Sequence, residues 1–161
     1  MNDILFKTND YIFSYRVAGI CIHNGKMLLH KAKSDEGYAF PGGHVSFGET
    51  NEKTLKREFA EEIGANITVG KLKWVGEIFF PLSGKPCHQI CLYYLVEIKN
   101  IADFSNDVFM GKEEIGGDDF EIEFHWIPLE QLNKIKIYPE KATELLLKLD
   151  GGIEHFIYKE I

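Results

Sequence analysis

The sequence predicts an α/β fold in which a mixed β-sheet lies between helices. Strand-like segments are interleaved with two helical segments along the 161 residues, and this alternation is typical of a sheet covered by helices. Tight turns join some strand-like segments, whereas longer connections separate others, which indicates a mixed sheet. A length of 161 residues and a hydrophobic fraction of 45% suit one domain with its own core. We therefore expect a single domain over residues 1–161.

The first element expected along the chain is a β-hairpin. Residues 15–23 and 27–32 are strand-like, and the Asn24-Gly25 pair between them accepts the positive φ angles that a type I′ turn requires. A loop then leads to a short extended piece at residues 38–40. Pro41-Gly42-Gly43 follows, and the chain is expected to turn sharply there.

A short amphipathic helix is expected next, starting near Thr50. Thr50 is a suitable N-cap residue, because its hydroxyl can accept a hydrogen bond from a free backbone N–H group of the first turn. Leu55, Phe59 and Ile63 recur every four residues and form a stripe that is expected to face the core. Gly64 then suits the left-handed conformation that often ends a helix.

The rest of the chain predicts three more strands and a second helix. They are expected in this order: strands at 67–80 and 87–98, a long polar loop at 100–119, a strand at 120–127 and a helix at 139–149. Gly76 would permit a kink in the first of these strands. The apolar run of the second strand predicts a place at the centre of the sheet. A loop of the length expected at 100–119 is unusual in a compact domain, so we expect it to be functional or mobile.

Charge and cysteine content argue against several classes of protein. The net charge of −7 disfavours a general binder of nucleic acid or of anionic membranes, because both select basic surfaces. No apolar run approaches the roughly 20 residues of a membrane span. Cys21, Cys87 and Cys91 are odd in number and are expected as free thiols in a reducing cytoplasm. Cys87 and Cys91 would lie roughly 13 Å apart in a strand, which is too far for one zinc ion.

Three carboxylates crowd the end of the first predicted helix. Glu58, Glu61 and Glu62 lie on one face of its last turn, just before Gly64. The C-terminus of a helix carries partial negative charge, so each acid there costs about 0.3–1 kcal/mol. Like charges one turn apart add roughly a few tenths of a kcal/mol. A positive partner is therefore expected at this position, and a divalent cation is the simplest one.

The spacing around these acids matches a known motif. Gly43, five residues, Glu49, seven residues and the run REFAEEIGA resemble the Nudix box of the Nudix hydrolases, here at residues 43–65. Seven fixed identities at background frequencies of about 5–7% coincide by chance on the order of once in 10⁸ positions. Phe59 and Ala65 fill two slots in which the family more often has aliphatic residues. This departure concerns packing rather than chemistry.

The resemblance implies a fold, a reaction and a cofactor. Nudix hydrolases form an α/β/α sandwich around a mixed sheet, and they cleave a nucleoside diphosphate linked to another moiety with Mg²⁺ or Mn²⁺. Metal ions suit this reaction because they neutralise a pyrophosphate, polarise a phosphoryl oxygen and acidify a bound water. Dinucleoside polyphosphates, nucleotide sugars and nucleoside triphosphates all stay open as small-molecule substrates. A homodimer is also a possibility, because family members are often dimers.

Roles for the residues of the box follow from the same resemblance. The expected metal ligands are the backbone carbonyl of Gly43 and the carboxylates of Glu58, Glu61 and Glu62. Arg57 and Glu49 are expected to support the catalytic groups by bracing the loop against the helix, as a pair if they meet. Gly64 is expected to have a structural role at the helix end.

The general base is less fixed within the family, where either a helix carboxylate or a carboxylate from a distant loop can serve. Glu58 and Glu61 are the helix candidates in this sequence. The acidic stretch at residues 113–123 supplies the distant candidates, and Glu121 is favoured among them. The alternative for any single acid of that stretch is an ordinary position on a solvated, charged loop.

Residues outside the box are candidates for contacts with substrate. Arg16, Lys31 and Lys33 are expected near the edge of the site, where each could contact phosphate or could be an ordinary surface group. His88 follows a turn and could also contact substrate phosphate, although an ordinary position at a strand edge is the simpler role. Four aromatic residues could stack on a base, although core packing is the simpler role for at least half of them. They are Phe79, Phe80, Tyr93 and Tyr94.

Two other functions are compatible with a Nudix box. A non-catalytic domain that senses nucleotides would usually lack one or more of the box acids, and this sequence keeps all of them. An isomerase acting on an isoprenoid diphosphate would need further catalytic groups that the sequence does not identify. Metal-dependent release of phosphate, monophosphate or pyrophosphate from a panel of substrates would separate hydrolysis from both alternatives.

Overall fold

The computed structural model describes residues 2–160. The strands are β1 (Leu5–Lys7), β2 (Ile12–His23), β3 (Lys26–Lys31), β4 (Tyr38–Ala39), β5 (Gly42–His44), β6 (Ile67–Leu82), β7 (Lys85–Ile98), β8 (Val108–Ile115), β9 (Asp118–Pro128), β10 (Ile137–Tyr138) and β11 (Glu154–Lys159). The two α-helices are α1 (Asn51–Ile63) and α2 (Ala142–Leu145). Three short 3₁₀ segments complete the chain at Ile101–Phe104, Leu129–Lys134 and Leu146–Lys148.

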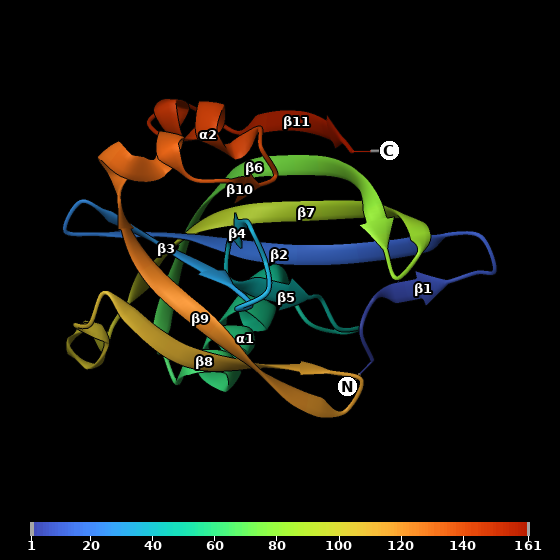
Figure 1. Cartoon of the computed structure of the whole chain (residues 1–161), viewed down its shortest axis with the longest axis horizontal. Coiled ribbons are helices and arrows are strands. Elements are labelled where there is room, and N and C mark those ends of the chain that lie inside the picture. The colour runs from blue at the N-terminus through green and yellow to red at the C-terminus, as the bar shows by residue number, and fades with distance from the viewer. Residues whose placement is uncertain (1, 161) are drawn as a thin grey trace.

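The centre of the molecule is a mixed sheet. Its main path runs in the order β10-β4-β3-β2-β7-β6-β11, and the long strands β2, β7 and β6 lie side by side in Figure 1. β2 pairs in parallel with β7, whereas β6 and β7 form an antiparallel pair. β11 then adds in parallel to β6 at one edge. As expected from its apolar run, β7 is an inner strand of this sheet.

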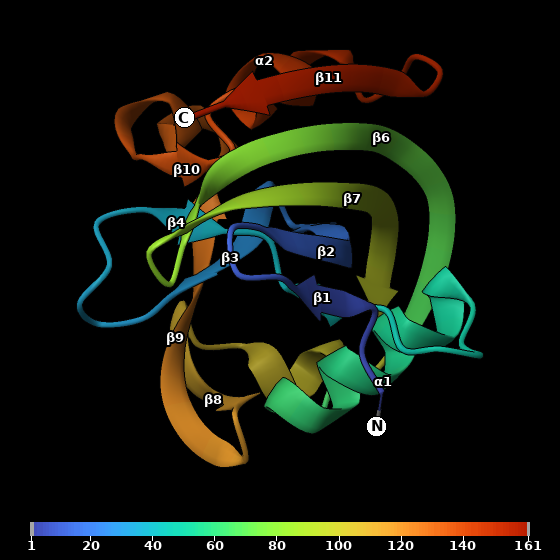
Figure 2. The ribbon, with the colours of Figure 1, turned by 90° about the vertical axis from the view of Figure 1, so that its right-hand side faces the viewer.

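Each face of the sheet packs on its own layer. Successive residues of a strand point to opposite faces, so Val17 of β2 packs in one core cluster with Leu55 and Phe59 of α1. Its neighbour Ala18 packs in the other cluster with Leu145 of α2. Figure 2 shows the two helices on opposite sides of the strands. The predicted sandwich with a central mixed sheet is therefore confirmed.

Local signals at the first hairpin and the first helix are also confirmed. Asn24 and Gly25 have φ angles of 50° and 73°, as a type I′ turn requires. Thr50 is the N-cap of α1, and its hydroxyl oxygen accepts a hydrogen bond of 3.2 Å from the backbone N–H of Lys53. Gly64 follows the helix with a φ angle of 70°. Both ends of α1 are thus fixed by residues within the box or directly beside it.

The predicted loop at residues 100–119 is wrong, because most of it is a short 3₁₀ turn and strand β8. β8 pairs antiparallel with β9 through a turn at Gly116-Gly117. Phe109 of β8 lies 5.5 Å from the ring of Phe124 in β9, measured between ring centroids. The inward positions of β8 hold Phe109, Gly111 and Glu113, whereas Val108 and Met110 are exposed. Apolar character therefore does not follow burial along β8, and its sequence shows no alternating strand pattern.

Two further expectations need correction. The helix expected at 139–149 is a single α-helical turn, α2, that continues as a 3₁₀ segment. It has no side-chain N-cap hydrogen bond, so burial of its apolar residues stabilises it rather than capping. The kink suggested at Gly76 is absent there. The irregularities of β6 lie instead between Val69 and Trp74, while the ring of Phe156 occupies the space beside Gly76.

Among residues 2–160, no helix combines the length and the apolar character needed to cross a lipid bilayer.

Candidate active site

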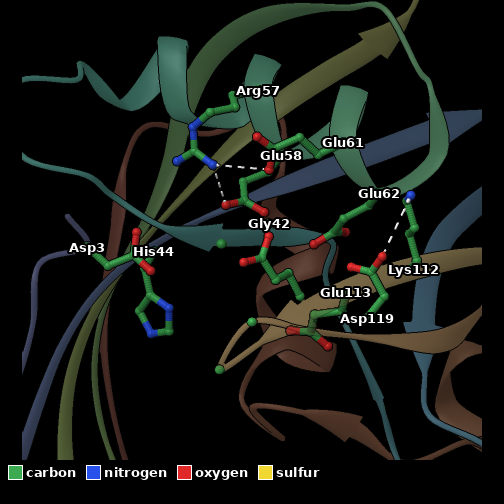
Figure 3. A pocket seen from close by; sticks show the side chains of 14 residues that line it. Asp3, Gly42, His44, Arg57, Glu58, Glu61, Glu62, Lys112, Glu113 and Asp119 are labelled. Carbon is green, nitrogen blue, oxygen red and sulfur yellow. Dashed lines mark hydrogen bonds and ion pairs between the residues drawn. The ribbon is translucent and has the colours of Figure 1, made fainter. Parts of the chain in front are cut away.

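A cavity of about 850 Å³ lies where three elements meet. The last turns of α1 form one wall, β5 forms the floor, and the hairpin of β8 and β9 forms the opposite wall (Figure 3). Its lining is rich in acids, which are Asp3, Glu58, Glu61, Glu62, Glu113, Glu114 and Asp119. The basic residues among its lining are Arg57 and Lys112. The cavity is therefore strongly negative before any ligand binds.

The packing of α1 places its acids at the wall of this cavity. Leu55 and Phe59 are fully buried in the core, so the helix cannot rotate about its axis without exposing them. Glu58 and Glu62 lie beside that stripe and are half-buried, whereas Glu61 is exposed. Gly43 of β5 faces Glu58 so closely that a Cβ atom at this position would collide with the Glu58 carboxyl group. A side chain at position 43 would therefore displace the Glu58 carboxyl group from its place beside β5.

Arg57 holds the loop and the helix of the box together. Its Nε and Nη2 atoms donate to the carboxylate of Glu49 at distances of 2.9–3.2 Å. Thr54 also donates to Glu49, at 3.0 Å. The Arg57 Nη1 atom donates to Glu58 at 2.9 Å, which leaves the Glu58 carboxylate oriented from one side. The ion pair of Arg57 and Glu49 that the sequence suggested is therefore present. It is largely shielded from solvent, since the Glu49 side chain is only 7% exposed.

The electrostatics of the cavity favour a cation. Burial and the neighbouring charges of Glu58 and Glu113 together raise the pKa of Glu62 to about 9, with a partial offset from the charge of Arg16. Burial also raises the pKa of Glu58, although the charge of Arg57 opposes this shift. Carboxyl groups that resist ionisation when alone become good ligands when a cation supplies the missing positive charge.

The donors of the cavity are of the chemical type that suits a magnesium ion. In the part of the chain that the structure describes, no group of three acidic, histidine or cysteine side chains is already arranged to hold a metal ion. An open set of carboxylates suits Mg²⁺, which keeps several waters and takes further oxygens from substrate phosphates. Glu58, Glu61, Glu62 and the carbonyl of Gly43 are the groups of the box that could hold it, since all four residues line the same cavity.

The comparisons with known proteins identify the family. The family model described as NUDIX domain matches residues 14–147. The chain belongs to the Nudix hydrolase family. This membership confirms the predicted class of Nudix hydrolase, and the matched segment contains the whole box at residues 43–65.

Individual Nudix relatives support the same conclusion. A protein of Mycobacterium tuberculosis named "Putative mutator protein MutT4" is 31% identical over an alignment of 123 residues, which covers 71% of this chain and 44% of that protein. The chain therefore spans less than half the length of this relative. The ADP-ribose pyrophosphatase of Methanocaldococcus jannaschii is 31% identical over an alignment of 139 residues, which covers 84% of this chain and 74% of that protein.

The Nudix fold is also found among solved structures. The crystal structure of a Nudix hydrolase from Nitrosomonas europaea superposes with a TM-score of 0.58 and 17% sequence identity. The match covers 96% of this chain and 82% of that chain. At this level of identity the likeness concerns the fold.

The structure brings Glu113, rather than Glu121, to the Nudix cavity. Glu121 is exposed and lines a neighbouring hollow of about 460 Å³ with Glu61 and Glu62. Glu113 is half-buried in the wall that faces α1. The sequence signal for Glu113 is its position in β8 two residues after Gly111, which is itself two residues after the inward-facing Phe109. The sequence predicts a loop over residues 100–119, and that prediction does not reveal the alternation of inward positions in β8.

Three of the residues expected to contact substrate lie in two different places. Arg16 and Lys31 both line a second cavity of about 590 Å³. His88 lies away from it, exposed and packed against the ring of Phe79 at 4.4 Å between ring centroids. His88 lines neither this second cavity nor the acidic one. The geometry thus separates the two basic residues from the histidine.

Proposed function

We propose that this Nudix protein is a divalent-cation-dependent pyrophosphohydrolase acting on a nucleoside diphosphate derivative. The observation that carries the proposal is the pair Glu58 and Glu62, half-buried beside each other and facing Glu113 across an acidic cavity. Such a cluster is unfavourable alone and suits a cation with an anionic substrate. The relative named ADP-ribose pyrophosphatase supports a nucleotide diphosphate substrate, and a nucleotide sugar is our first choice to test.

Each group of the cavity has a distinct task in this proposal. When bound, Mg²⁺ or Mn²⁺ supplies charge neutralisation and a more acidic water. Glu58, Glu61, Glu62 and the Gly43 carbonyl hold the cation, and Arg57 keeps Glu58 oriented through their 2.9 Å contact. Glu113 is the better-placed general base, because it lines the acidic cavity whereas Glu121 does not. Its carboxylate would take the proton from the attacking water.

A single substitution tests the proposal. Glu62→Gln keeps the size of the side chain but removes its charge, so turnover should fall at least about 100-fold, as it does when one essential electrostatic group is lost. Turnover would be measured with ADP-ribose, ATP and diadenosine tetraphosphate in the presence of Mg²⁺ or Mn²⁺. Glu52→Gln is the matched control, because Glu52 lies in the first turn of the same helix and pairs with Lys56. Full turnover by Glu62→Gln would refute the assignment.

The same panel tests the alternative of a non-catalytic nucleotide-sensing domain. Such a domain would bind members of the panel and release no product from any of them. The proposed setting is the cytoplasm, which is supported by Cys21, Cys87 and Cys91, all buried as free thiols. A homodimer stays a prediction that light scattering of the purified protein would test.

A further inference from the structure

The segment before β1 crosses the loop of the Nudix box. Two backbone hydrogen bonds, of 2.8 and 2.9 Å, join Ile4 and Asn2 to the loop at residues 45–47. Asp3 lies between these contacts and forms an isolated β-bridge with Ser46. Its side chain lines the acidic cavity (Figure 3). This segment precedes the part of the chain that the Nudix model matches, so the box by itself does not predict the contact.

The carboxylate of Asp3 fixes the direction of a buried hydroxyl group. Ser46 is only 1% exposed, and its hydroxyl donates to Oδ1 of Asp3 at 3.1 Å. An ionised carboxylate only accepts hydrogen bonds, so the single hydroxyl proton of Ser46 points toward Asp3. The lone pairs of the Ser46 oxygen are then free to accept, and Nη2 of Arg57 donates to this oxygen at 3.4 Å.

Ser46 completes the set of acceptors around Arg57. A guanidinium group has five N–H bonds, and the structure offers an acceptor for each of them. Nε and one N–H of Nη2 donate to Glu49, and the other N–H of Nη2 donates to Ser46. Nη1 donates to Glu58 and Glu61. Because the guanidinium group is rigid and planar, an acceptor at Nη2 also fixes the direction in which Nη1 meets Glu58.

The backbone contacts of the segment do not explain an acid at position 3. Hydrogen bonds from the backbone of Asn2 and Ile4 form with any side chain between them. A carboxylate there adds negative charge to a cavity that is already acidic, and like charges at short distance repel each other. What the carboxylate contributes is an acceptor for Ser46, whose buried hydroxyl would otherwise leave its proton without a partner.

We propose that Asp3 is a positioning residue for Glu58 and acts on it through Ser46 and Arg57. The proposal rests on the proposed function, in which Glu58 holds the cation. Asp3 orients the Ser46 hydroxyl, Ser46 holds one end of the guanidinium group, and the other end of that group orients Glu58 at 2.9 Å. Without Asp3 the hydroxyl can turn, and its lone pairs are no longer held toward Arg57.

Binding of Mn²⁺ in the absence of substrate tests the proposal separately from hydrolysis. Asp3→Ala should weaken Mn²⁺ binding, measured by electron paramagnetic resonance, by about 10-fold, which is the lower end of the loss typical for groups that orient metal ligands. Asp3→Asn should recover binding to within about threefold of the native protein, because its amide oxygen can accept the same hydrogen bond. In turnover assays, Asp3→Ala should raise the Mg²⁺ concentration that gives half-maximal rate and keep the KM for substrate.

The same titration separates this proposal from the proposed function. Native Mn²⁺ binding by Glu62→Gln would contradict the proposed function itself. Loss of Mn²⁺ binding in Glu62→Gln together with native binding in Asp3→Ala would overturn only the role of Asp3. Asp3 is exposed, so its replacement should leave the core intact.

A double-mutant cycle tests whether Asp3 acts through Ser46. Ser46→Ala should weaken Mn²⁺ binding, and adding Asp3→Ala to it should weaken binding by less than about twofold more, because residues in one network are not additive. Thr8→Ala is the matched control for the fold of the segment, since the Thr8 hydroxyl oxygen accepts from the backbone N–H of Tyr11 at 2.9 Å in the turn after β1. It should lower the Tm and keep native Mn²⁺ binding.

Three results would overturn the proposal. Additive losses in the cycle would show that Asp3 acts independently of Ser46. Equal weakening by Asp3→Asn and Asp3→Ala would show that Asp3 acts by its charge. An equal loss of Mn²⁺ binding in Thr8→Ala would show that Asp3 contributes only through the fold of the segment.

Discussion

The half-buried Glu62 and the buried His30 show how single residues can carry function at a cost in stability. Glu62 is held beside other acids, and His30 is held without a hydrogen-bond partner within the described chain. Neither arrangement stabilises the fold, since each would be relieved by an uncharged or apolar side chain. Both residues line cavities, so a bound ligand is the natural source of compensation.

The titration of His30 leads to a prediction about stability. Its pKa is about 3 in the folded chain, against an ordinary value of 6.5 for histidine, so between these two pH values the unfolded chain binds more protons. Protonation then favours unfolding, and His30 costs stability as the pH falls below about 6.5. The free energy of unfolding of His30→Phe, relative to that of the native protein, should therefore increase by on the order of 2 kcal/mol as the pH falls from 7 to 4.5.

Urea unfolding at several pH values would measure this difference directly. His155→Phe is the control, because the side chain of His155 is 58% exposed and pairs with Glu77 at the surface. A stability difference between His30→Phe and the native protein that stays constant over this pH range would contradict the assignment of a buried, neutral His30.

The residues of the box were predictable from the sequence, whereas His30 was not. Glu58, Glu61 and Glu62 stand at fixed spacings in a motif, and their unfavourable place at a helix end was visible without a structure. His30 is one histidine in an apolar strand, and nothing in its neighbours along the chain shows that its nitrogens lack partners. That property depends on β4 and β9, the strands that pair with β3 in space.

At the scale of elements, the hairpin of β8 and β9 completes the acidic cavity. β8 contacts the end of α1 at Gly111, where a Cβ atom would collide with Phe124, Ile63 and the carbonyl oxygen of Glu62. The hairpin carries Glu113 to the wall opposite α1. The position of this acid thus depends on how closely one strand approaches one helix.

This contact predicts a large effect from a small side chain. Gly111→Val should push β8 away from α1, lower the free energy of unfolding by about 1–3 kcal/mol and reduce turnover, because Glu113 moves with the strand. Met110→Val is the control, because Met110 directly precedes Gly111 in β8 and is 47% exposed. Urea unfolding and steady-state turnover would be measured on both variants. Native turnover in a destabilised Gly111→Val protein would show that hydrolysis does not depend on the placement of Glu113.

Patterns in the sequence indicate the long strands and both helices but not β1, β5, β8, β10 or β11. For β8 the reason is physical. The long strands β6 and β7 have apolar or aromatic runs that indicate strands by themselves. β8 exposes the apolar side chains of Val108 and Met110 and has Gly111 and Glu113 at inward positions, so apolar side chains do not mark its buried face. Its strand conformation depends on pairing with β9 and on the space that Gly111 leaves for α1.

At the scale of the whole molecule, the binding of a cation should stabilise the fold. A ligand that binds only the folded state raises stability by about 2.7 kcal/mol at 100 times its dissociation constant. Saturating Mg²⁺ should therefore raise the Tm of the native protein. It should have little effect on the double variant Glu58→Gln with Glu62→Gln, which loses both half-buried ligands.

The metal-free proteins provide a second comparison in the same experiment. Without Mg²⁺, the double variant should melt at or above the Tm of the native protein, because burial of two neighbouring acids no longer opposes folding. Scanning calorimetry with and without Mg²⁺ would give all four values. An equal rise in Tm for both proteins would place the cation away from these two glutamates.

The order of strands is the part of the architecture that local patterns did not reveal. β2 and β7 run in parallel with a register of ten residue pairs, from Ile12 with Cys87 to Cys21 with Val96. More than 60 residues separate β2 from β7 along the chain, and no turn signal connects them. Pairing of this kind is decided by the burial of both sheet faces together, which a strand-by-strand analysis does not contain.

The division of the sandwich into two layers has a consequence for how this protein could be retargeted. The acids proposed for hydrolysis lie on α1, while Ile78, Phe80, Tyr93 and Tyr158 of the second cavity belong to the core layer of α2 and β11. Mutant libraries restricted to residues of this layer could therefore change which substrate the protein accepts. The residues proposed for hydrolysis would stay unchanged. Glu113 is the residue to hold constant in such a library, since it borders both compartments.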